Sequence, residues 1–393
     1  MSSEVGQPPP SPQPHPPWKH VVFYKTPNIK DEIDVNPKKG AWQDLTPQDL
    51  ILLKDSIGPK QHDNFDFIKR ITNPYELIFT NSNNPSLPAS VALLKPLSRS
   101  FFKLIEMLDI MKFFEYTSSV SKYKTLHLCE GPGGFIEAFL DRAEHHKKTV
   151  KVAHAMTLKQ TNNSIPGWRA AARLLSRHPE IHIEYGPSST GNILEEKNQE
   201  YLEQTLKHGA HLVTADGGFD FSVDFSGQEK HVFPLLVAST LIAFSCLAPK
   251  SGCFILKIFD SFSIPTQQLL TICSIHFKEW TIYKPVTSRP CNSERYFIGK
   301  GFHGFSESSK ELLQSILNMN TDIISIWDSN EQLQLVTDTI NLQIQKYVEE
   351  QKTALSNVLS SEIDPESIRV LWKEQHERSL KWCNRFQIPT KTT

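Results

Sequence analysis

Short apolar runs alternate with longer helical stretches between residues 93 and 305, and this alternation predicts an open parallel α/β sheet. A second pattern closes the region, where residues 280–283 and 295–299 flank a turn-rich loop and predict a hairpin-like pair of strands. The other predicted strands cover residues 125–129, 150–156, 211–215 and 253–259, with predicted helices at 135–143 and 235–247.

The two flanks of this region follow other patterns. Residues 1–17 hold seven prolines and almost no bulky apolar side chains, which predicts a disordered tail. Apolar clusters at 50–53 and 65–71 indicate short helices packed on a larger body. Beyond Ser306, apolar residues recur at helical spacing, and we expect the resulting helices to cover the sheet. The chain thus divides into a tail (1–17), an N-terminal extension (18–87), an α/β domain (88–305) and a C-terminal helical extension (306–393).

Composition narrows the class of protein. The 393 residues include 42 Lys+Arg and 43 Asp+Glu, so a nucleic-acid partner would have to be held by a local basic patch. The six cysteines form no CxxC pair, which argues against a zinc ribbon or a redox dithiol. The longest apolar stretch, residues 232–248, is too short for a bilayer and contains Pro234, so we expect an intracellular protein without a membrane span.

A glycine turn follows the first predicted strand of the domain. Glycines between a strand and a helix let the backbone approach a nucleotide-like ligand at the carboxyl edge of such a sheet. Ile136 stands where a dinucleotide fingerprint requires glycine, so the turn favours a cofactor without a pyrophosphate, although such a turn can also be a mere tight connection. The turn consists of Glu130, Gly131, Pro132, Gly133, Gly134 and Phe135, and the carboxylate of Glu130 could meet a ligand ammonium group.

Charged residues stand at the ends of other predicted strands. Asp216 precedes two glycines at the end of the third strand, on the edge that carries chemistry in open α/β sheets. Lys257 lies in an otherwise apolar run, where a charge is costly unless it is paired or functional. Two further charged residues are Lys103 on a predicted helix and Glu294 at the start of the last strand. Each of them, taken alone, would be interpreted as a solvent-exposed residue without a function. Lys257 is the strongest anomaly in the chain.

Taken together, Lys103, Asp216, Lys257 and Glu294 resemble the Lys-Asp-Lys-Glu tetrad of FtsJ/RrmJ-type ribose 2′-O-methyltransferases. The segments LCEGPGGF, TADGGFDF, ILKIF and KPVTSRPCNSERYFIGKG are similar to cap-specific mRNA 2′-O-methyltransferases of eukaryotes and large nucleocytoplasmic DNA viruses, the adrift type. The resemblance spans roughly residues 88–305. It implies a Rossmann-like, S-adenosylmethionine-dependent methyltransferase sheet with helical N- and C-terminal extensions.

The resemblance also implies a reaction and a substrate. The acceptor would be the ribose 2′-hydroxyl of the first transcribed nucleotide of m7G-capped mRNA, converting cap-0 to cap-1. By resemblance Lys257 is the general base, since a ribose hydroxyl is a poor nucleophile until its proton is removed. Burial and Lys103 would lower the pKa of Lys257, whereas Asp216 and Glu294 would raise it, and the sequence does not decide the balance. No metal is expected, because the methyl donor carries its own activating charge.

Other roles follow from the same resemblance. The predicted cofactor site comprises residues 130–135, Asp216 and Asn192, an amide where the family more often has an acid near the adenine. Residues 155–159 lack the acid that holds the cofactor ribose in many members. Arg289 and Arg295, beside Glu294, are the predicted RNA phosphate contacts, with a solvated turn as the equal alternative. Trp168 and Phe219 are candidates for stacking on 7-methylguanine, although Trp168 suits packing better.

Two other functions stay open from the sequence. The same chemistry could act on ribosomal or transfer RNA, because the tetrad does not select the RNA. A non-catalytic cap- or RNA-binding subunit of a capping or transcription complex belongs to a different class, and retention of the whole tetrad argues against it. Capping or transcription proteins are further candidate partners. The expected location is the nucleus for a cellular protein, and the cytoplasmic factory or the virion for a viral one.

Overall fold

The computed structural model of the chain describes residue 18 and residues 21–27, 35–57, 64–80, 88–161, 167–218, 227–360 and 364–391. The predicted tail, residues 1–17, lies outside the described residues.

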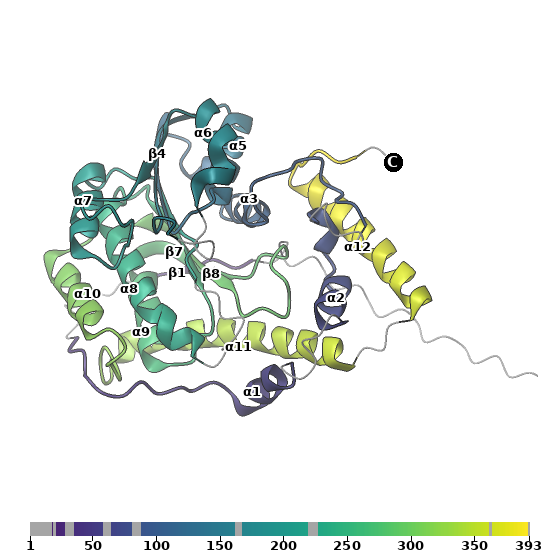
Figure 1. Cartoon of the computed structure of the whole chain (residues 1–393). Coiled ribbons are helices and arrows are strands. Elements are labelled where there is room, and N and C mark those ends of the chain that lie inside the picture. Colours follow the sequence, from purple (N-terminus) through teal and green to yellow (C-terminus); the bar gives the residue numbers. More distant parts are fainter. Residues whose placement is uncertain are drawn as a thin grey trace, which may run out of the picture.

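The described residues form one eight-stranded sheet (Figure 1). Its strands, in spatial order, are β1 (Tyr24–Lys25), β7 (Phe277–Tyr283), β8 (Arg295–Phe302), β6 (Cys253–Ile258), β5 (Leu212–Ala215), β2 (Lys122–Leu128), β3 (Thr149–Met156) and β4 (Ile181–Glu184). The five strands from β6 to β4 are parallel, while β8 runs antiparallel to both of its neighbours. The fold is therefore the predicted Rossmann-like α/β sheet, and the hairpin-like pair is confirmed as β7 and β8.

Helices cover both faces of this sheet (Figure 1). One core packs against α7 (Glu196–Leu206), α8 (Gln228–Cys246) and α9 (Ile264–Ile275), and the other against α3 (Ser100–Ile110), α5 (Gly134–His145) and α12 (Pro365–Arg385). Along β6, Phe254 and Leu256 face the first core, and Cys253 and Ile255 face the second. Burial on both faces explains the continuous apolar run of this strand, to which Lys257 is the exception. Smaller elements are α4 (Phe113–Tyr116), η4 (Trp168–Ala171) and α6 (Ala172–Arg177).

Two parts of the sheet were missed by the pattern. β4 has four residues, and its outward positions are partly polar, so it lacks the apolar run that marked the inner strands. β1 has only two residues and comes from the N-terminal extension, where it pairs antiparallel with Trp280 and Glu279 of β7. Strands this short are specified by the neighbour that accepts them rather than by their own sequence.

The N- and C-terminal segments pack on the sheet and on each other. The predicted short helices are α1 (Gln48–Asp55) and α2 (Asn64–Ile71), followed by η3 (Glu76–Ile78). The C-terminal segment is helical as predicted, with α10 (Glu307–Met319) and α11 (Glu331–Ser360) preceding α12.

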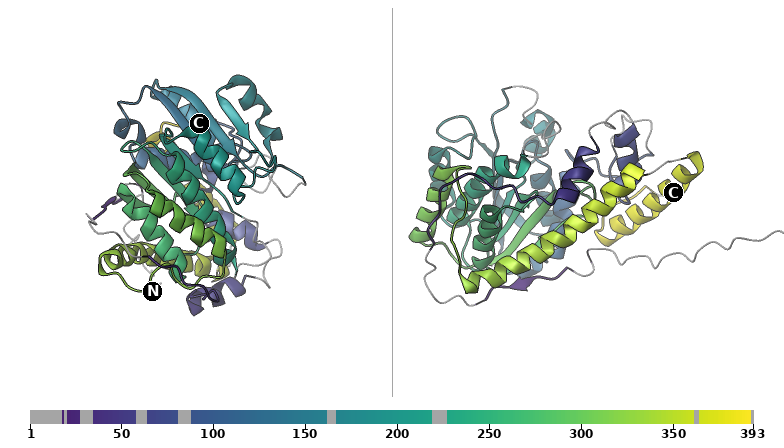
Figure 2. Two further views of the ribbon diagram at one scale, coloured as in Figure 1. Left: turned by 90° about the vertical axis from the view of Figure 1, so that its left-hand side faces the viewer. Right: turned by 90° about the horizontal axis from the view of Figure 1, so that it is seen from below.

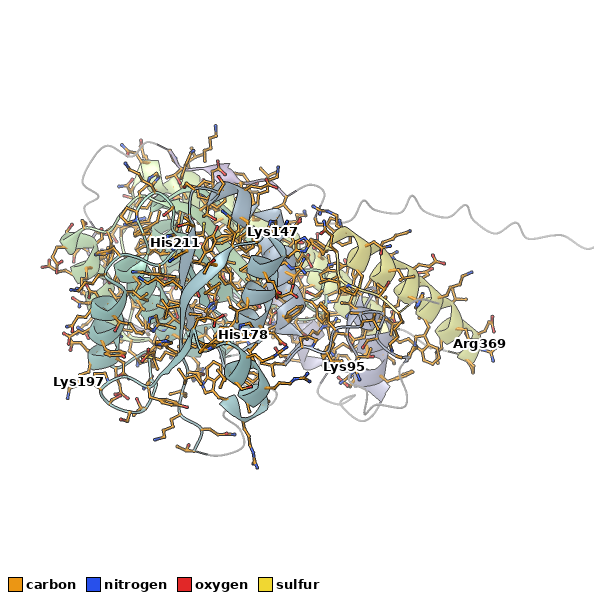
Figure 3. All side chains as sticks on the ribbon, turned by 90° about the horizontal axis from the view of Figure 1, so that it is seen from above. Lys95, Lys147, His178, Lys197, His211 and Arg369 are labelled. Carbon is orange, nitrogen blue, oxygen red and sulfur yellow. The ribbon has the colours of Figure 1, made fainter. Side chains whose placement is uncertain are left out.

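The long helix α11 crosses the underside of the molecule (Figure 2), where it packs against α9 and β7. Helix α12 extends from the body, with Arg369 near its outer end (Figure 3). The predicted covering role therefore applies to α11 and to the C-terminal end of α12, which buries Trp382 and Cys383 in the second core. No helix in the described part of the chain combines the length and apolar character needed to cross a membrane.

Candidate active site

Four charged side chains meet at the carboxyl edge of the sheet and are called the tetrad here: Lys103 of α3, Asp216 after β5, Lys257 of β6 and Glu294 before β8. Lys103 Nζ lies 2.7 Å from Glu294 Oε1. Lys257 Nζ lies 3.3 Å from Asp216 Oδ1 and 3.8 Å from Glu294 Oε2, and it donates a hydrogen bond to the Asp216 carbonyl oxygen. The structure thus brings together four residues that are up to 191 positions apart in the sequence.

Burial and charge act in opposite directions on the tetrad, whose side chains are 10–15% exposed. Burial lowers the pKa of Lys257, but the carboxylates of Asp216 and Glu294 raise it by more, so this pKa lies above its ordinary value. Burial raises the pKa of Glu294, but Lys103 and Lys257 lower it by more, so this pKa lies well below its ordinary value. At neutral pH the free chain therefore carries Lys257 as an ammonium and Glu294 as a carboxylate.

Tyr296 is a member of this site that the sequence analysis missed. It stands opposite Lys257 in the β6–β8 register, and its hydroxyl donates a hydrogen bond of 2.8 Å to Asp216 Oδ1. Burial and the charges of Asp216 and Glu294 raise its pKa well above the ordinary value, so the phenol stays neutral and keeps donating. Its position two residues after Glu294, and hence on the same face of the chain as that residue, was the available signal.

Lys284, at the end of β7, holds the loop that leads to Glu294. Its Nζ donates hydrogen bonds to the carbonyl oxygens of Asn292 and Glu294, the latter at 3.0 Å. Burial and the charges of Arg295 and Lys103 lower the pKa of Lys284 to about 7, although Glu294 opposes the shift. Lys284 thus fixes the backbone of the last tetrad residue rather than its side chain.

The glycine turn joins β2 to the start of α5. Gly133 has a φ of 111°, a left-handed conformation that favours glycine. Gly131 and Pro132 are partly exposed, whereas Gly133, Gly134 and Phe135 are buried. The Phe135 ring is fully buried and lies 6.1 Å from the ring of Tyr296, so it packs beneath the turn rather than on the predicted cofactor surface.

Glu130 has a different role from the ammonium contact predicted for it. Its Oε1 accepts hydrogen bonds from the backbone N–H groups of Phe135 and Ile136, at 2.8 and 3.0 Å, and so caps the start of α5. The residue is 4% exposed, and burial raises the pKa of its carboxyl group well above the ordinary value, with the charge of Asp216 adding to the rise. Glu130 thereby fixes the direction of α5 behind the glycine turn.

Asn192 lies at the same edge of the sheet, partly exposed. It follows Gly191, where a side chain would collide with the carbonyl oxygen of Thr157, the residue after β3. The Asn192 Oδ1 accepts a hydrogen bond from the Leu194 N–H, which stabilises the local turn. The predicted cofactor residue is therefore placed next to the end of β3.

Arg289 is engaged by a carboxylate within the chain. Its Nη2 and Nε donate hydrogen bonds to Glu76 Oε1 and Oε2, at 2.9 and 3.2 Å. Arg99 Nη1 lies 3.6 Å from the same carboxylate, whose side chain is 2% exposed. We call Glu76, Arg99 and Arg289 the arginine cluster. It connects the N-terminal segment to the loop before β8, so the guanidinium predicted to contact RNA phosphate is held by protein instead.

Arg295 also departs from its prediction. The residue is fully buried, and its guanidinium donates weak hydrogen bonds of 3.4 Å to the Phe259 carbonyl oxygen and to Gln351 Oε1 of α11. A side chain without exposed surface cannot contact an RNA phosphate in this conformation. Arg295 instead joins β8 to the C-terminal helix.

Of the two aromatic candidates for the cap, Trp168 is buried in a cluster with Ile136 and Leu174, and a side chain at Gly133 would touch its ring. It is a packing residue beneath the glycine turn. Phe219 lies outside the described residues.

The FtsJ-like methyltransferase family matches residues 96–302, more than half of the chain. The chain belongs to this family. The match contains the glycine turn, Asn192 and all four tetrad residues, and the family implies an enzyme that depends on S-adenosylmethionine.

Curated relatives come from viruses and eukaryotes. A cap-specific mRNA (nucleoside-2′-O-)-methyltransferase of Autographa californica nuclear polyhedrosis virus is 32% identical over 190 residues, which cover 48% of this chain and 68% of the viral protein. Cap-specific mRNA (nucleoside-2′-O-)-methyltransferase 1 of Dictyostelium discoideum is 28% identical. The alignment covers 76% of this chain but only 41% of the Dictyostelium protein. The enzyme of the same name from Trypanosoma brucei brucei is 30% identical, with 53% of this chain and 56% of that protein covered.

The residues at the sheet edge suit the cofactor that the family implies. The ends of β2, β3 and β5 are in register, and the backbone N–H groups of Cys129 and Asp216 bond to Met156 and Leu128 across them. Partly exposed groups at this edge include the Gly131–Pro132 backbone, the Asp216 carboxylate and the Asn192 amide. A carboxylate suits an amino-acid ammonium group, and an amide suits a nucleobase edge. The donor set therefore fits a cofactor that is part amino acid and part nucleoside.

Proposed function

We propose that this chain methylates the ribose 2′-hydroxyl of the first transcribed nucleotide of m7G-capped mRNA. The observation that carries the proposal is the assembly of Lys103, Asp216, Lys257 and Glu294 into one cluster beside the glycine turn. The names of the curated relatives support the cap as the substrate class. Capped mRNA is thus the proposed partner and S-adenosylmethionine the proposed cofactor.

The bound cofactor would supply an electrophilic methyl group on a positively charged sulfur. Gly131, Pro132, Asn192 and Asp216 would hold it, through the partly exposed groups at the sheet edge. This assignment requires no metal ion, because the charge that activates the methyl group is carried by the donor.

Lys257 is the proposed general base. As the neutral amine, its Nζ would accept the proton of the ribose 2′-hydroxyl, and the bound cofactor would supply the methyl group that takes the place of that proton on the oxygen. The pKa of Lys257 lies above its ordinary value in the free chain, so only a small fraction of the protein holds the neutral amine at neutral pH. We therefore expect the rate to rise with pH as this fraction grows.

The other three members of the tetrad position this lysine and the ribose. Glu294 lies between the two lysines, 2.7 Å from Lys103 and 3.8 Å from Lys257, and so fixes the spacing of the two ammonium groups. Asp216 holds Lys257 from the other side with its carboxylate and its carbonyl oxygen. A hydroxyl that enters this cluster meets donors and acceptors already oriented, which lowers the entropic cost of the reaction.

The decisive experiment is transfer of labelled methyl from S-adenosylmethionine to a short m7GpppA-capped RNA. The same RNA without a cap, and a capped RNA already methylated at the first 2′-oxygen, serve as controls. Label on the first RNA alone is the expected result. Equal label on capped and uncapped RNA would replace the proposal with a general RNA ribose methyltransferase, and absence of label with demonstrated cofactor binding would replace it with a non-catalytic binding role.

A further inference from the structure

A second polar cluster lies at the opposite end of the sheet from β8 and β6. It consists of His154 on β3, His182 and Glu184 on β4, and Tyr201 on α7. His154 and His182 are direct partners in the parallel β3–β4 register, and Glu184 follows His182 by two positions on the same face of the strand. Figure 1 shows β4 at the margin of the sheet, near α6 and α7. The cluster is separate from the tetrad.

The side chains of this cluster converge. His154 Nδ1 lies 2.8 Å from Glu184 Oε1, and the Tyr201 hydroxyl donates a hydrogen bond of 2.7 Å to Glu184 Oε2. One nitrogen of each histidine and one oxygen of Glu184 all lie within 4.8 Å of one another. His154 is 7% exposed, whereas His182 is exposed and gives the cluster access to solvent.

Two imidazoles and one carboxylate make up the three groups that converge here. A carboxylate among two imidazoles is a ligand set for a late first-row divalent ion. Magnesium and calcium prefer oxygen ligands and fit this set poorly.

We propose that His154, His182 and Glu184 bind one divalent transition-metal ion, with zinc as the best fit. Ligand atoms around a tetrahedral zinc ion lie about 3.3–3.6 Å apart, given bonds of about 2.0–2.2 Å. His154 Nδ1 and Glu184 Oε1 would separate slightly as the ion displaces the proton between them, and the His182 nitrogen would move inward. Water would take the fourth position on the exposed side.

Tyr201 would orient the carboxylate from outside the ligand set, as partners of metal ligands commonly do. The ion would clamp the four-residue edge strand β4 to β3. The proposal is independent of the methyltransferase function.

The test uses the full chain after removal of metal by a chelator. Calorimetric titration with Zn²⁺ is expected to give one ion per chain, and thermal unfolding is expected to move to higher temperature with Zn²⁺ present. Titration with Co²⁺ is expected to give the strong visible absorption of a tetrahedral site. His182→Ala changes an exposed side chain, so it should leave the metal-free unfolding temperature unchanged while weakening Zn²⁺ binding at least about tenfold.

Two further variants separate a built site from general histidine affinity. Tyr201→Phe keeps all three ligands and should weaken binding by roughly 10-fold. His178, labelled in Figure 3, forms a comparable pair with Glu180 at 3.0 Å but belongs to no three-ligand group in the described part of the chain, so His178→Ala should bind Zn²⁺ like the unaltered protein. Equal Zn²⁺ affinity in His182→Ala and the unaltered chain, or no binding at all, would overturn the proposal. None of these readouts depends on methyl transfer.

Discussion

The tetrad and the arginine cluster are two groups of charged side chains, and each links the start of α3 to the loop before β8. Arg99 and Lys103 lie four residues apart at the start of α3, and Arg289 and Glu294 lie five residues apart in the loop before β8. In the arginine cluster one carboxylate with a 2% exposed side chain is shared by two guanidinium groups. In the tetrad two lysines and two carboxylates keep 10–15% exposure.

The difference lies in which group can exchange a proton. A guanidinium stays charged at any working pH and binds a carboxylate through fixed geometry, which suits a structural connection. A lysine can lose its proton when its surroundings change, which suits catalysis. The arginine cluster therefore holds the loop in place, whereas the tetrad is arranged to move a proton.

The largest expected effect is on the tetrad. Lys257→Ala removes the proposed base and should lower methyl transfer by about 10²–10⁴-fold while binding of cofactor and capped RNA persists. The measurement is labelled-methyl transfer at saturating substrates, with binding followed separately.

Lys300→Ala is the matched control for this variant. Lys300 also lies on a strand and pairs with a carboxylate, Glu279 at 2.7 Å, but it stands opposite Cys253 at the other end of β6. Its methyl transfer should match that of the unaltered chain. A similar loss of activity in both variants would remove the special role of Lys257.

The arginine cluster should respond through stability. Glu76→Gln leaves two partly buried guanidinium groups without their carboxylate and should lower the free energy of unfolding by about 1.5–3 kcal/mol, measured by denaturant titration. Arg99 and Arg289 lower the pKa of Glu76 below its ordinary value in spite of burial, so its contribution is present above that value and is lost as pH falls through the folded pKa. The difference in the free energy of unfolding between the unaltered chain and Glu76→Gln should therefore become smaller in acid. A constant difference down to pH 3 would contradict the assignment.

Tyr296→Phe should sharpen the assignment of Lys257. Without the phenol, more of the Asp216 charge acts on Lys257, so its pKa rises and the ascending limb of the rate profile moves to higher pH. The hydrogen bond to a charged group is worth about 1.5–3 kcal/mol, so activity at neutral pH should fall roughly tenfold or more. A fall of equal size at every pH would instead indicate a purely structural role.

The smallest expected effect belongs to Arg289→Lys. The charge is kept but the two-pronged bond to Glu76 is lost, at a cost of about 1 kcal/mol in stability. Affinity for capped RNA and its salt dependence should stay unchanged. If Arg289 contacts a phosphate after all, the affinity for capped RNA should fall in this variant, because a lysine cannot reproduce the two-pronged bond of a guanidinium to phosphate.

Part of the candidate site could be read from the pattern of the sequence, whereas Lys103 and Glu294 were singled out only by the resemblance to the FtsJ-type tetrad. Asp216 and Lys257 stand out as charges at the limits of apolar runs, and the glycine turn stands out by its composition. The partners of Arg289 and Arg295 could not be read in this way. Glu76 lies 213 residues before Arg289, and Gln351 lies 56 residues after Arg295, so no local pattern links them.

The pattern of apolar and polar positions by itself determined the order of the main strands and helices, except β1 and β4, and the location of the glycine turn, since this alternation encodes local structure. The resemblance to the FtsJ-type tetrad singled out the four charged residues. Only the tertiary structure decided which charges meet. In the folded chain Arg289 binds Glu76, and Arg295 is buried beside Gln351 of α11. Glu130 accepts hydrogen bonds from the start of α5, and Tyr296 donates a hydrogen bond to Asp216. The physical reason is that strand neighbours and helix docking are set by burial of apolar faces over the whole chain, and polar side chains then bind whatever partners that packing brings within reach.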